Sequence, residues 1–209
     1  FEHAASTQPL FQLWWVVGAL LEALQAGGIE PTVSVKRLLG HVDRELKRLQ
    51  DGELAIADEV DIAADPALAL AAAAAAARRD TQLDRGTLAR LAIEVPDPPT
   101  PWPDAVRGAF VDLLTAGPPA LVLLEALDQQ GVWERYVPEW PSVRSKPQRN
   151  AYHRFTVDRH VVETCIEASA LIREVSRPDV LLVSALLHDI GKRGEVEHSV
   201  AGEPIARAI

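Results

Sequence analysis

The sequence predicts a mainly all-α protein that contains one small β-hairpin. Apolar residues recur at steps of three and four in segments such as 35–49, which is the spacing of an amphipathic helix. Residues 71–77 are an unbroken run of alanine, the strongest helix former. Alternation of apolar and other residues is confined to the stretch 52–64, where it favours two short paired strands.

The composition limits the classes of function. The chain has 209 residues, and its 21 basic and 30 acidic side chains give a net charge of −9. This charge excludes non-specific nucleic-acid binding by the chain as a whole. The single cysteine, Cys165, without a secretory segment before it, indicates a cytoplasmic location. Because the chain starts at Phe1 and has no Met, we expect it to be an internal piece of a longer protein.

The N-terminal part predicts two helices. The most apolar stretch, residues 10–24, is shorter than the about 20 apolar residues that a membrane span requires, so we expect a buried helix and no membrane partner. Gly27 and Gly28 would end this helix. The basic residues of the next helix, 35–49, are expected to form a solvated face, with His3 and His41 as solvated helix residues.

The middle of the chain predicts a hairpin and then a helix. Within 52–64 the strands would flank the turn-forming pair Asp58 and Glu59. Asp65 and Pro66 have the order of an N-cap and a first-turn proline, so a helix that contains the alanine run should begin there. Alanine adds little to a core, and the run therefore indicates close helix packing instead of a binding site.

Further helices are expected at 87–93, 104–115 and 119–129. Between the first two, five of the eight residues 96–103 are proline, which predicts a stiff, extended linker. Three aromatic residues after the last of them are expected to form a core instead of a base-stacking platform; they are Trp133, Tyr136 and Trp140. We interpret residues 1–143 as a helical connector region and residues 144–209 as the start of a second domain.

Histidines are concentrated near the C-terminus, and one of them is beside an aspartate. His188 and Asp189 follow a helix, starting near Pro178, that is apolar from Val180 to Leu187 except for one serine. Burying such a pair without compensation costs several kcal/mol, and a divalent cation would remove this cost. Imidazole and carboxylate groups are suitable ligands for such an ion.

A third ligand is expected from the preceding helix. His160 begins a segment whose apolar stripe includes Cys165, which we therefore assign to the core and not to a nucleophile. The short turn 176–179 makes the two helices antiparallel, so His160 and His188 should lie at the same end. His153 is equally consistent with a structural role and with a role in the site.

These residues resemble the HD superfamily of metal-dependent phosphohydrolases. The match is carried by His160, by His188-Asp189 and by Gly191-Lys192. The segments 143–160, 185–192 and 197–202 are similar to the HD domain of the bifunctional PII uridylyltransferase/uridylyl-removing enzymes. The resemblance implies a helical bundle of the HD type, of which residues 144–209 would be the N-terminal part.

The resemblance also implies a reaction and a set of site residues. The reaction is metal-dependent hydrolysis that removes UMP from the uridylylated PII signal protein, in bacterial nitrogen regulation. His160, His188 and Asp189 would bind the divalent metal, with Mg²⁺ or Mn²⁺ expected. Asp189, Lys192 and His198 would be the catalytic residues, and Lys192 and His198 would also contact phosphate. Arg154 and Arg159 would also bind substrate. We expect these two residues and Lys146 to line the entrance of the site.

The sequence departs from the family pattern in ways that leave alternatives open. The family has a final aspartate ligand downstream, and no Asp follows Asp189, so we expect an incomplete metal shell and weak or absent activity of the 209-residue piece. Glu203 is an alternative ligand. Glu197 replaces the family's Asp before His198. Nothing resembles the uridylyltransferase or glutamine-binding parts, which places this stretch in the middle of such an enzyme. Rival interpretations are an HD phosphohydrolase that acts on a free nucleotide or alarmone, and a catalytically silent helical interaction module.

Overall fold

The computed structural model describes residues 18–20, 22–28, 30, 32–40, 52–147, 155–192 and 197–208. The chain divides into two compact units, residues 1–51 and 52–209. In the first unit the described residues 18–20, 22–25 and 33–40 are helical, and Gly27 ends the first helical stretch with φ of 70°. The predictions for residues 10–17, His3 and His41 lie outside the described residues. Among the helices that are described, none combines the length and the apolar character of a membrane span.

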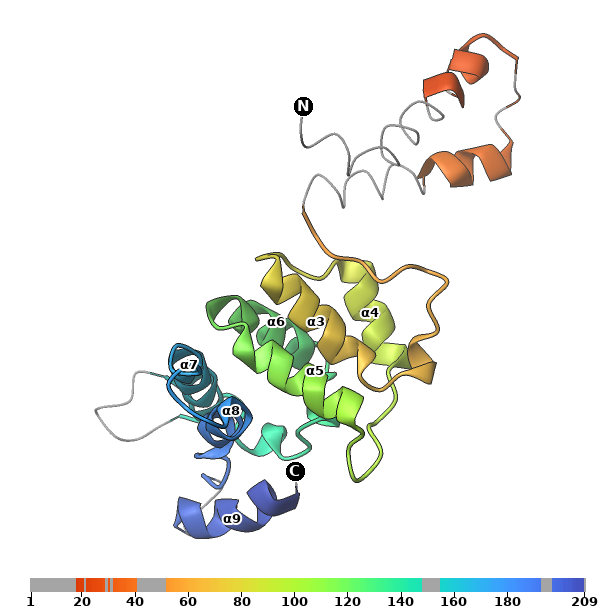
Figure 1. Cartoon of the computed structure of the whole chain (residues 1–209). Helices are drawn as coiled ribbons and strands as arrows, with labels where there is room; N and C mark the ends of the chain where they lie inside the picture. Colours follow the sequence, from red (N-terminus) through yellow and green to blue (C-terminus); the bar gives the residue numbers. More distant parts are fainter. Residues whose placement is uncertain are drawn as a thin grey trace. The chain divides into compact units, whose positions relative to one another are not determined.

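The second unit is built of α-helices and short 3-10 helices (Figure 1). The mainly helical fold class is therefore confirmed, and the described residues contain no named strand. The α-helices are α3 (Leu68–Arg78), α4 (Arg85–Glu94), α5 (Asp104–Thr115), α6 (Pro118–Gln129), α7 (Val157–Ser169), α8 (Pro178–Leu187) and α9 (His198–Ala208). The 3-10 helices are η2 (Ile62–Ala64), η3 (Trp133–Arg135) and η4 (Trp140–Ser142).

The predicted hairpin at 52–64 is wrong. Leu54 does not pair with the 60–62 segment; it forms an isolated parallel bridge with Leu83, far along the chain. The second predicted strand is the 3-10 helix η2, because the Asp61 carboxylate accepts a hydrogen bond from the N–H of Ala63 at 3.1 Å and caps it. The alternating apolar residues thus have another explanation. Ile56 lies in an extended segment and Ile62 in η2, and both side chains are buried in the core.

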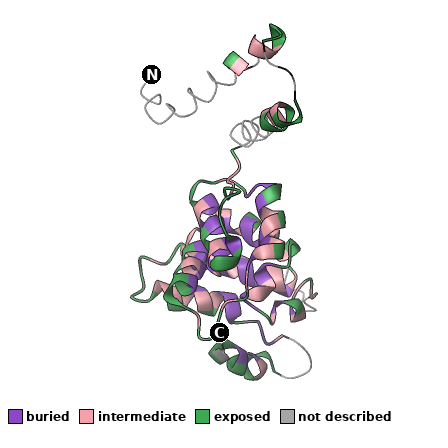
Figure 2. Cartoon of the chain, turned by 90° about the vertical axis from the view of Figure 1, so that its right-hand side faces the viewer, coloured by how far each residue is buried: buried purple, intermediate pink, exposed green. Residues whose placement is uncertain are grey.

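The alanine run packs as the sequence predicts. Most of α3 is buried, and the helix contacts α5 and α6. Small side chains allow this close approach, and buried residues lie on the facing sides of the helices (Figure 2). Asp65 supports the turn before α3, accepting a hydrogen bond from the N–H of Ala67 at 2.8 Å. The helix begins at Leu68, two residues later than the proline suggested.

Aromatic rings connect the proline-rich segment to the helices. Trp102 contacts the rings of Phe110 and Tyr136 edge-on, and Phe110 stacks on Trp133 at 5.4 Å. The residues Trp133, Tyr136 and Trp140 are all buried, which confirms the predicted core. Segment 96–103 thus joins α4 and α5 within one compact unit, and the predicted domain boundary at 143 also falls inside that unit.

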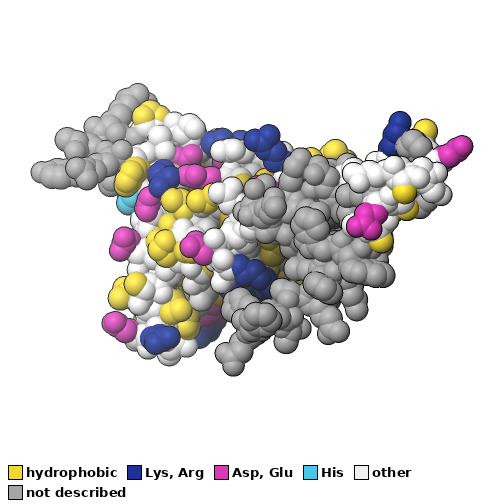
Figure 3. Space-filling view, turned by 90° about the horizontal axis from the view of Figure 1, so that it is seen from above, with side chains coloured by type: hydrophobic (Ala, Val, Ile, Leu, Met, Phe, Trp, Pro, Cys, Tyr) yellow, Lys and Arg dark blue, Asp and Glu magenta, His cyan; other side chains and the backbone are white. Residues whose placement is uncertain are grey.

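Charges of both signs are distributed over the surface. In the view of Figure 3, acidic and basic side chains are scattered among apolar and neutral ones. Several are paired across elements, as in the salt bridges of Arg78 with Asp112 and of Arg135 with Asp97. Arg144 pairs with Asp128 of α6 and with Glu134, which ties the segment before α7 to the helices that precede it.

Candidate metal centre

The candidate centre lies where α7 begins and α8 ends. The two helices pack against each other, as predicted. The connection between them is 170–177, which is longer than the predicted turn 176–179 because α7 ends at Ser169. His160 is in the first turns of α7, and its N–H donates to the Thr156 carbonyl at 2.9 Å. His188 is the C-cap of α8, and Asp189 follows it in a turn where the N–H of Lys192 donates to the Asp189 carbonyl.

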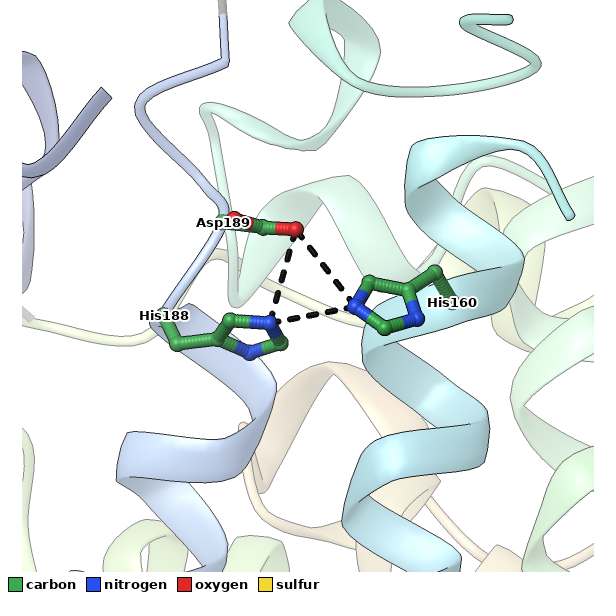
Figure 4. Close-up of side chains that lie close together, drawn as sticks. All are labelled: His160, His188 and Asp189. Atoms are coloured by element: carbon green, nitrogen blue, oxygen red, sulfur yellow. Dashed lines mark hydrogen bonds and ion pairs between the residues drawn. The ribbon is translucent and has the colours of Figure 1, made fainter. Parts of the chain in front are cut away.

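Three side chains from these helix ends converge (Figure 4). The Nε2 atoms of His160 and His188 are 3.3 Å apart. The Asp189 Oδ2 atom is 3.5 Å from the first and 3.4 Å from the second. The Asp189 side chain is 4 % exposed, whereas those of His160 and His188 are 27 % and 37 % exposed. The carboxylate is therefore the buried member of the group, and the two imidazoles are the members that solvent can reach.

A backbone contact fixes the orientation of the His188 ring. Its Nδ1 lies 2.8 Å from the Ala185 carbonyl oxygen, which can only accept a hydrogen bond. The Nδ1 atom therefore carries the proton of the neutral ring, and Nε2 keeps the lone pair that faces His160 and Asp189. Metal-binding histidines are commonly held in this way, with one ring nitrogen hydrogen-bonded to the protein and the other free to bind the ion.

The spacing of these atoms fits a divalent cation. Metal–ligand bonds of about 2.1 Å place neighbouring ligand atoms about 3.4 Å apart in a tetrahedral shell and about 3.0 Å apart in an octahedral one. The observed separations of 3.3, 3.4 and 3.5 Å agree with the first spacing and come close to the second. The group also offers one negative charge and two neutral donors, a set that binds divalent ions of intermediate hardness.

Lys192 and His198 approach the same carboxylate. The Lys192 Nζ atom is 2.6 Å from Asp189 Oδ2, and His198 Nε2 is 3.8 Å from Oδ1, the other oxygen. The two residues come from the turn after α8 and from the first position of α9. The other four residues that the sequence assigns to metal binding and catalysis are thus gathered around Asp189.

Glu197 has two functions that the sequence analysis did not assign. Its carboxylate accepts hydrogen bonds from the N–H groups of Ser199 and Val200 and from the Ser199 hydroxyl, so it caps the start of α9. These bonds, led by the hydroxyl, hold the pKa of Glu197 below its ordinary value. The ionised carboxylate is also 3.0 Å from Nδ1 of His198 and orients that ring. An acidic residue directly before a helix is stabilised by the helix dipole, and this sequence feature could have suggested the cap.

The structure also shows the contacts of other residues that the sequence analysis singled out. The Arg159 guanidinium is paired with Glu163 on its own helix and with Glu125 of α6, and the Glu163 hydrogen bond raises the pKa of Arg159. Lys146 is connected to α7 by its backbone carbonyl, which accepts from the N–H of Val157. Glu203 pairs with Arg207 on α9. The predictions for Arg154 and His153 lie outside the described residues.

Comparisons with known proteins identify relatives of most of the chain. It is 49 % identical over 160 residues to a bifunctional uridylyltransferase/uridylyl-removing enzyme of Streptomyces coelicolor, a match that covers 77 % of this chain and 19 % of that protein. The enzyme of the same name from Mycobacterium tuberculosis is 46 % identical over 151 residues, or 72 % of this chain and 19 % of the relative. The enzyme of that name from Corynebacterium glutamicum is 37 % identical over 145 residues, which cover 69 % of this chain and 21 % of the relative.

A family model described as the FimL scaffold protein second domain matches residues 1–85, which end before the candidate metal centre. No solved structure matches the chain significantly. The chain spans about a fifth of the length of the curated relatives that it matches. By its similarity to these proteins, the chain belongs to the family of bifunctional uridylyltransferase/uridylyl-removing enzymes.

Proposed function

We propose that residues 144–209 belong to an HD-type hydrolytic domain that removes UMP from uridylylated PII signal protein in the cytoplasm. The observation that carries this proposal is the convergence of His160, His188 and Asp189, with mutual distances of 3.3–3.5 Å. Relatives are named uridylyl-removing enzymes, and removal of a uridylyl group from a protein is a phosphodiester hydrolysis. A metal centre of this kind suits that chemistry.

The three converging residues would hold a divalent ion, either Mn²⁺ or Mg²⁺. When bound, the ion would polarise the phosphoryl group and lower the pKa of a coordinated water. Asp189 supplies the negative charge of the site and, being buried, has its carboxylate fixed by surrounding side chains. The Ala185 carbonyl keeps the His188 ring in the tautomer that presents Nε2.

Lys192 and His198 are proposed to act on the substrate phosphate. The family resemblance implies that UMP is carried on a tyrosine of PII. In the reaction, the oxygen of water bonds to phosphorus while the bond from phosphorus to the oxygen of that tyrosine breaks. The products are UMP and the tyrosine hydroxyl, which takes a proton that water loses. The ammonium of Lys192 would offset charge on the phosphoryl oxygens as a compact cation. Glu197 orients His198 through Nδ1, which leaves Nε2 to face the same region. Arg154 and Arg159 remain proposed contacts of the substrate.

The substrate assignment can be tested in a full-length family enzyme that carries this segment. The enzyme is incubated with uridylylated PII and, separately, with free nucleotides including an alarmone, with Mn²⁺ and with chelator. We expect metal-dependent release of UMP from PII and its loss in the His188→Ala variant. Hydrolysis of a free nucleotide while the PII adduct stays intact would assign a different substrate. Unchanged hydrolysis and metal content in His188→Ala would contradict the enzymatic proposal.

A further inference from the structure

The turn after Asp189 crosses helix α9 at backbone contact. A side-chain carbon placed on Gly191 would lie 2.8 Å from the Cα of Gly202 and closer still to the Gly202 nitrogen and the His198 carbonyl oxygen. In an α-helix the carbonyl of one residue accepts from the N–H four positions later, so His198 and Gly202 are partners in the first turn of α9. Gly191 therefore lies directly against that turn.

The crossing is asymmetric between its two glycines. A side-chain carbon on Gly202 would lie 3.4 Å from the Gly191 nitrogen and 3.8 Å from a methyl group of Ile190, which is ordinary van der Waals contact. Alanine thus fits at position 202 and not at position 191. Since the neighbours of Gly191 are backbone atoms, no side-chain rotation can relieve the overlap, and one of the two segments would have to move.

The turn that contains Gly191 is the better anchored of the two segments. Ile190 is fully buried, and its N–H donates to the Leu187 carbonyl at 3.0 Å, while the N–H of Lys192 donates to the Asp189 carbonyl at 3.0 Å. On α9 the buried residues, among those whose burial is described, are Gly202 and Ile205. A group added at Gly191 would therefore displace α9, and His198 is the first residue of that helix.

We propose that Gly191 is a positioning residue that acts through His198. Its lack of a side chain lets the first turn of α9 dock on the turn after Asp189, and this docking holds His198 Nε2 3.8 Å from Asp189 Oδ1. The structural part of this inference stands on the contacts alone. Its catalytic consequence rests on the proposed hydrolytic function.

The structural part is tested by hydrogen–deuterium exchange of the chain in Gly191→Ala and in the matched control Gly202→Ala. We expect the α9 amides to exchange at least about tenfold faster in Gly191→Ala, while Gly202→Ala stays near wild type. Titration with Mn²⁺ alone should give the same stoichiometry in both, because the three proposed ligands are on α7 and the end of α8. Unchanged α9 exchange in Gly191→Ala, or an equal rise in Gly202→Ala, would overturn the proposal.

The catalytic part is tested by combining Gly191→Ala with His198→Ala in the full-length family enzyme. If Gly191 acts through His198, the double variant releases UMP as slowly as His198→Ala alone, whereas independent effects would multiply and reject the proposal. If circular dichroism shows that Gly191→Ala does not fold, Ile205→Ala is used instead. For that variant we expect faster α9 exchange and a loss of UMP release that is smaller than in His198→Ala. Faster exchange with full release would reject it. An enzyme without UMP release in any form would contradict the proposed function, and the exchange data would still decide the role of Gly191.

Discussion

Two buried aspartates, one in the α3–α6 region and one in the α7–α9 region, show how the same residue serves structure or chemistry. Taken as whole residues, backbone included, Asp84 and Asp189 are each 3 % exposed. The Asp84 carboxylate caps α4, accepting hydrogen bonds from the N–H groups of Gly86 and Thr87. Asp189 instead has side chains of three histidines and Lys192 around it. Burial alone therefore does not identify a functional carboxylate, whereas the type of its partners does.

The same contrast extends to the rest of each region. In the α3–α6 region the described buried polar side chains serve the backbone: the Thr87 hydroxyl accepts from the N–H of Ile56 at 2.9 Å. In the α7–α9 region polar side chains face each other across helix ends. The first pattern stabilises a scaffold, and the second brings together groups that can bind an ion and a phosphate.

The largest expected effect separates the two aspartates. Asp189→Asn keeps the shape of the side chain and removes its charge, so Mn²⁺ affinity should fall by more than the roughly 10–100-fold that outer-shell partners cost. Asp84→Asn should leave Mn²⁺ affinity unchanged and stability nearly so, because asparagine caps helices as well as aspartate. Calorimetric titration with Mn²⁺ and thermal unfolding of both variants measure this. Equal losses of affinity in the two variants would remove the distinction.

The next effect tests the scaffold region by overpacking it. Ala73 is fully buried in α3, whereas Ala71 on the same helix is exposed. Ala73→Leu inserts three carbon atoms against α5 and α6 and should lower the free energy of unfolding by about 1–3 kcal/mol. Ala71→Leu, with the same change in composition, should be close to neutral. Urea denaturation compares the two, and a destabilised Ala71→Leu would show that α3 is covered on its outer side as well.

The sequence contained enough information to predict the helices and the gathering of the site residues. The α5 bounds agree with the predicted 104–115, and α6 begins one residue before the predicted 119. Periodicity and the short turn before α8 were sufficient to place His160 beside His188, because both are local features. The role of Lys192 near Asp189 came from resemblance and not from spacing.

Features that depend on distant parts of the chain were not predictable. The bridge between Leu54 and Leu83 replaced a hairpin that local alternation suggested equally well. The pairing of Arg159 with Glu125, 34 positions earlier, depends on how α6 and α7 pack against each other. The crossing at Gly191 and Gly202 depends on how α9 packs, and a glycine after a helix has a simpler local explanation as a helix stop.

A smaller, pH-dependent effect is expected from Cys165, which is buried between α7 and α8. Burial raises the pKa of its thiol from 9.0 to about 12. The folded state thus holds this proton more tightly than the unfolded state. The free energy of unfolding is therefore unaffected by the thiol below pH 9 and falls as the pH rises from 9 toward 12. At pH 10 the loss should be about 1.4 kcal/mol. Unfolding free energies at pH 8 and pH 10 measure it, and Cys165→Ala should show a shallower decline; an identical decline would assign the effect to other groups.

The smallest expected effect uses glycine to compare the two regions. Gly108 lies within α5 and is exposed, and a side-chain carbon placed on it would have none of the described residues within 4 Å. Gly108→Ala should raise the free energy of unfolding by about 0.5–1 kcal/mol, since alanine loses less backbone entropy in a helix. The same substitution at Gly191 should loosen α9. Thermal unfolding of the two variants should show changes in stability of opposite sign, if glycine is dispensable in the scaffold and required beside the site. A stabilised Gly191→Ala variant whose α9 amides stay protected would show that both glycines are dispensable.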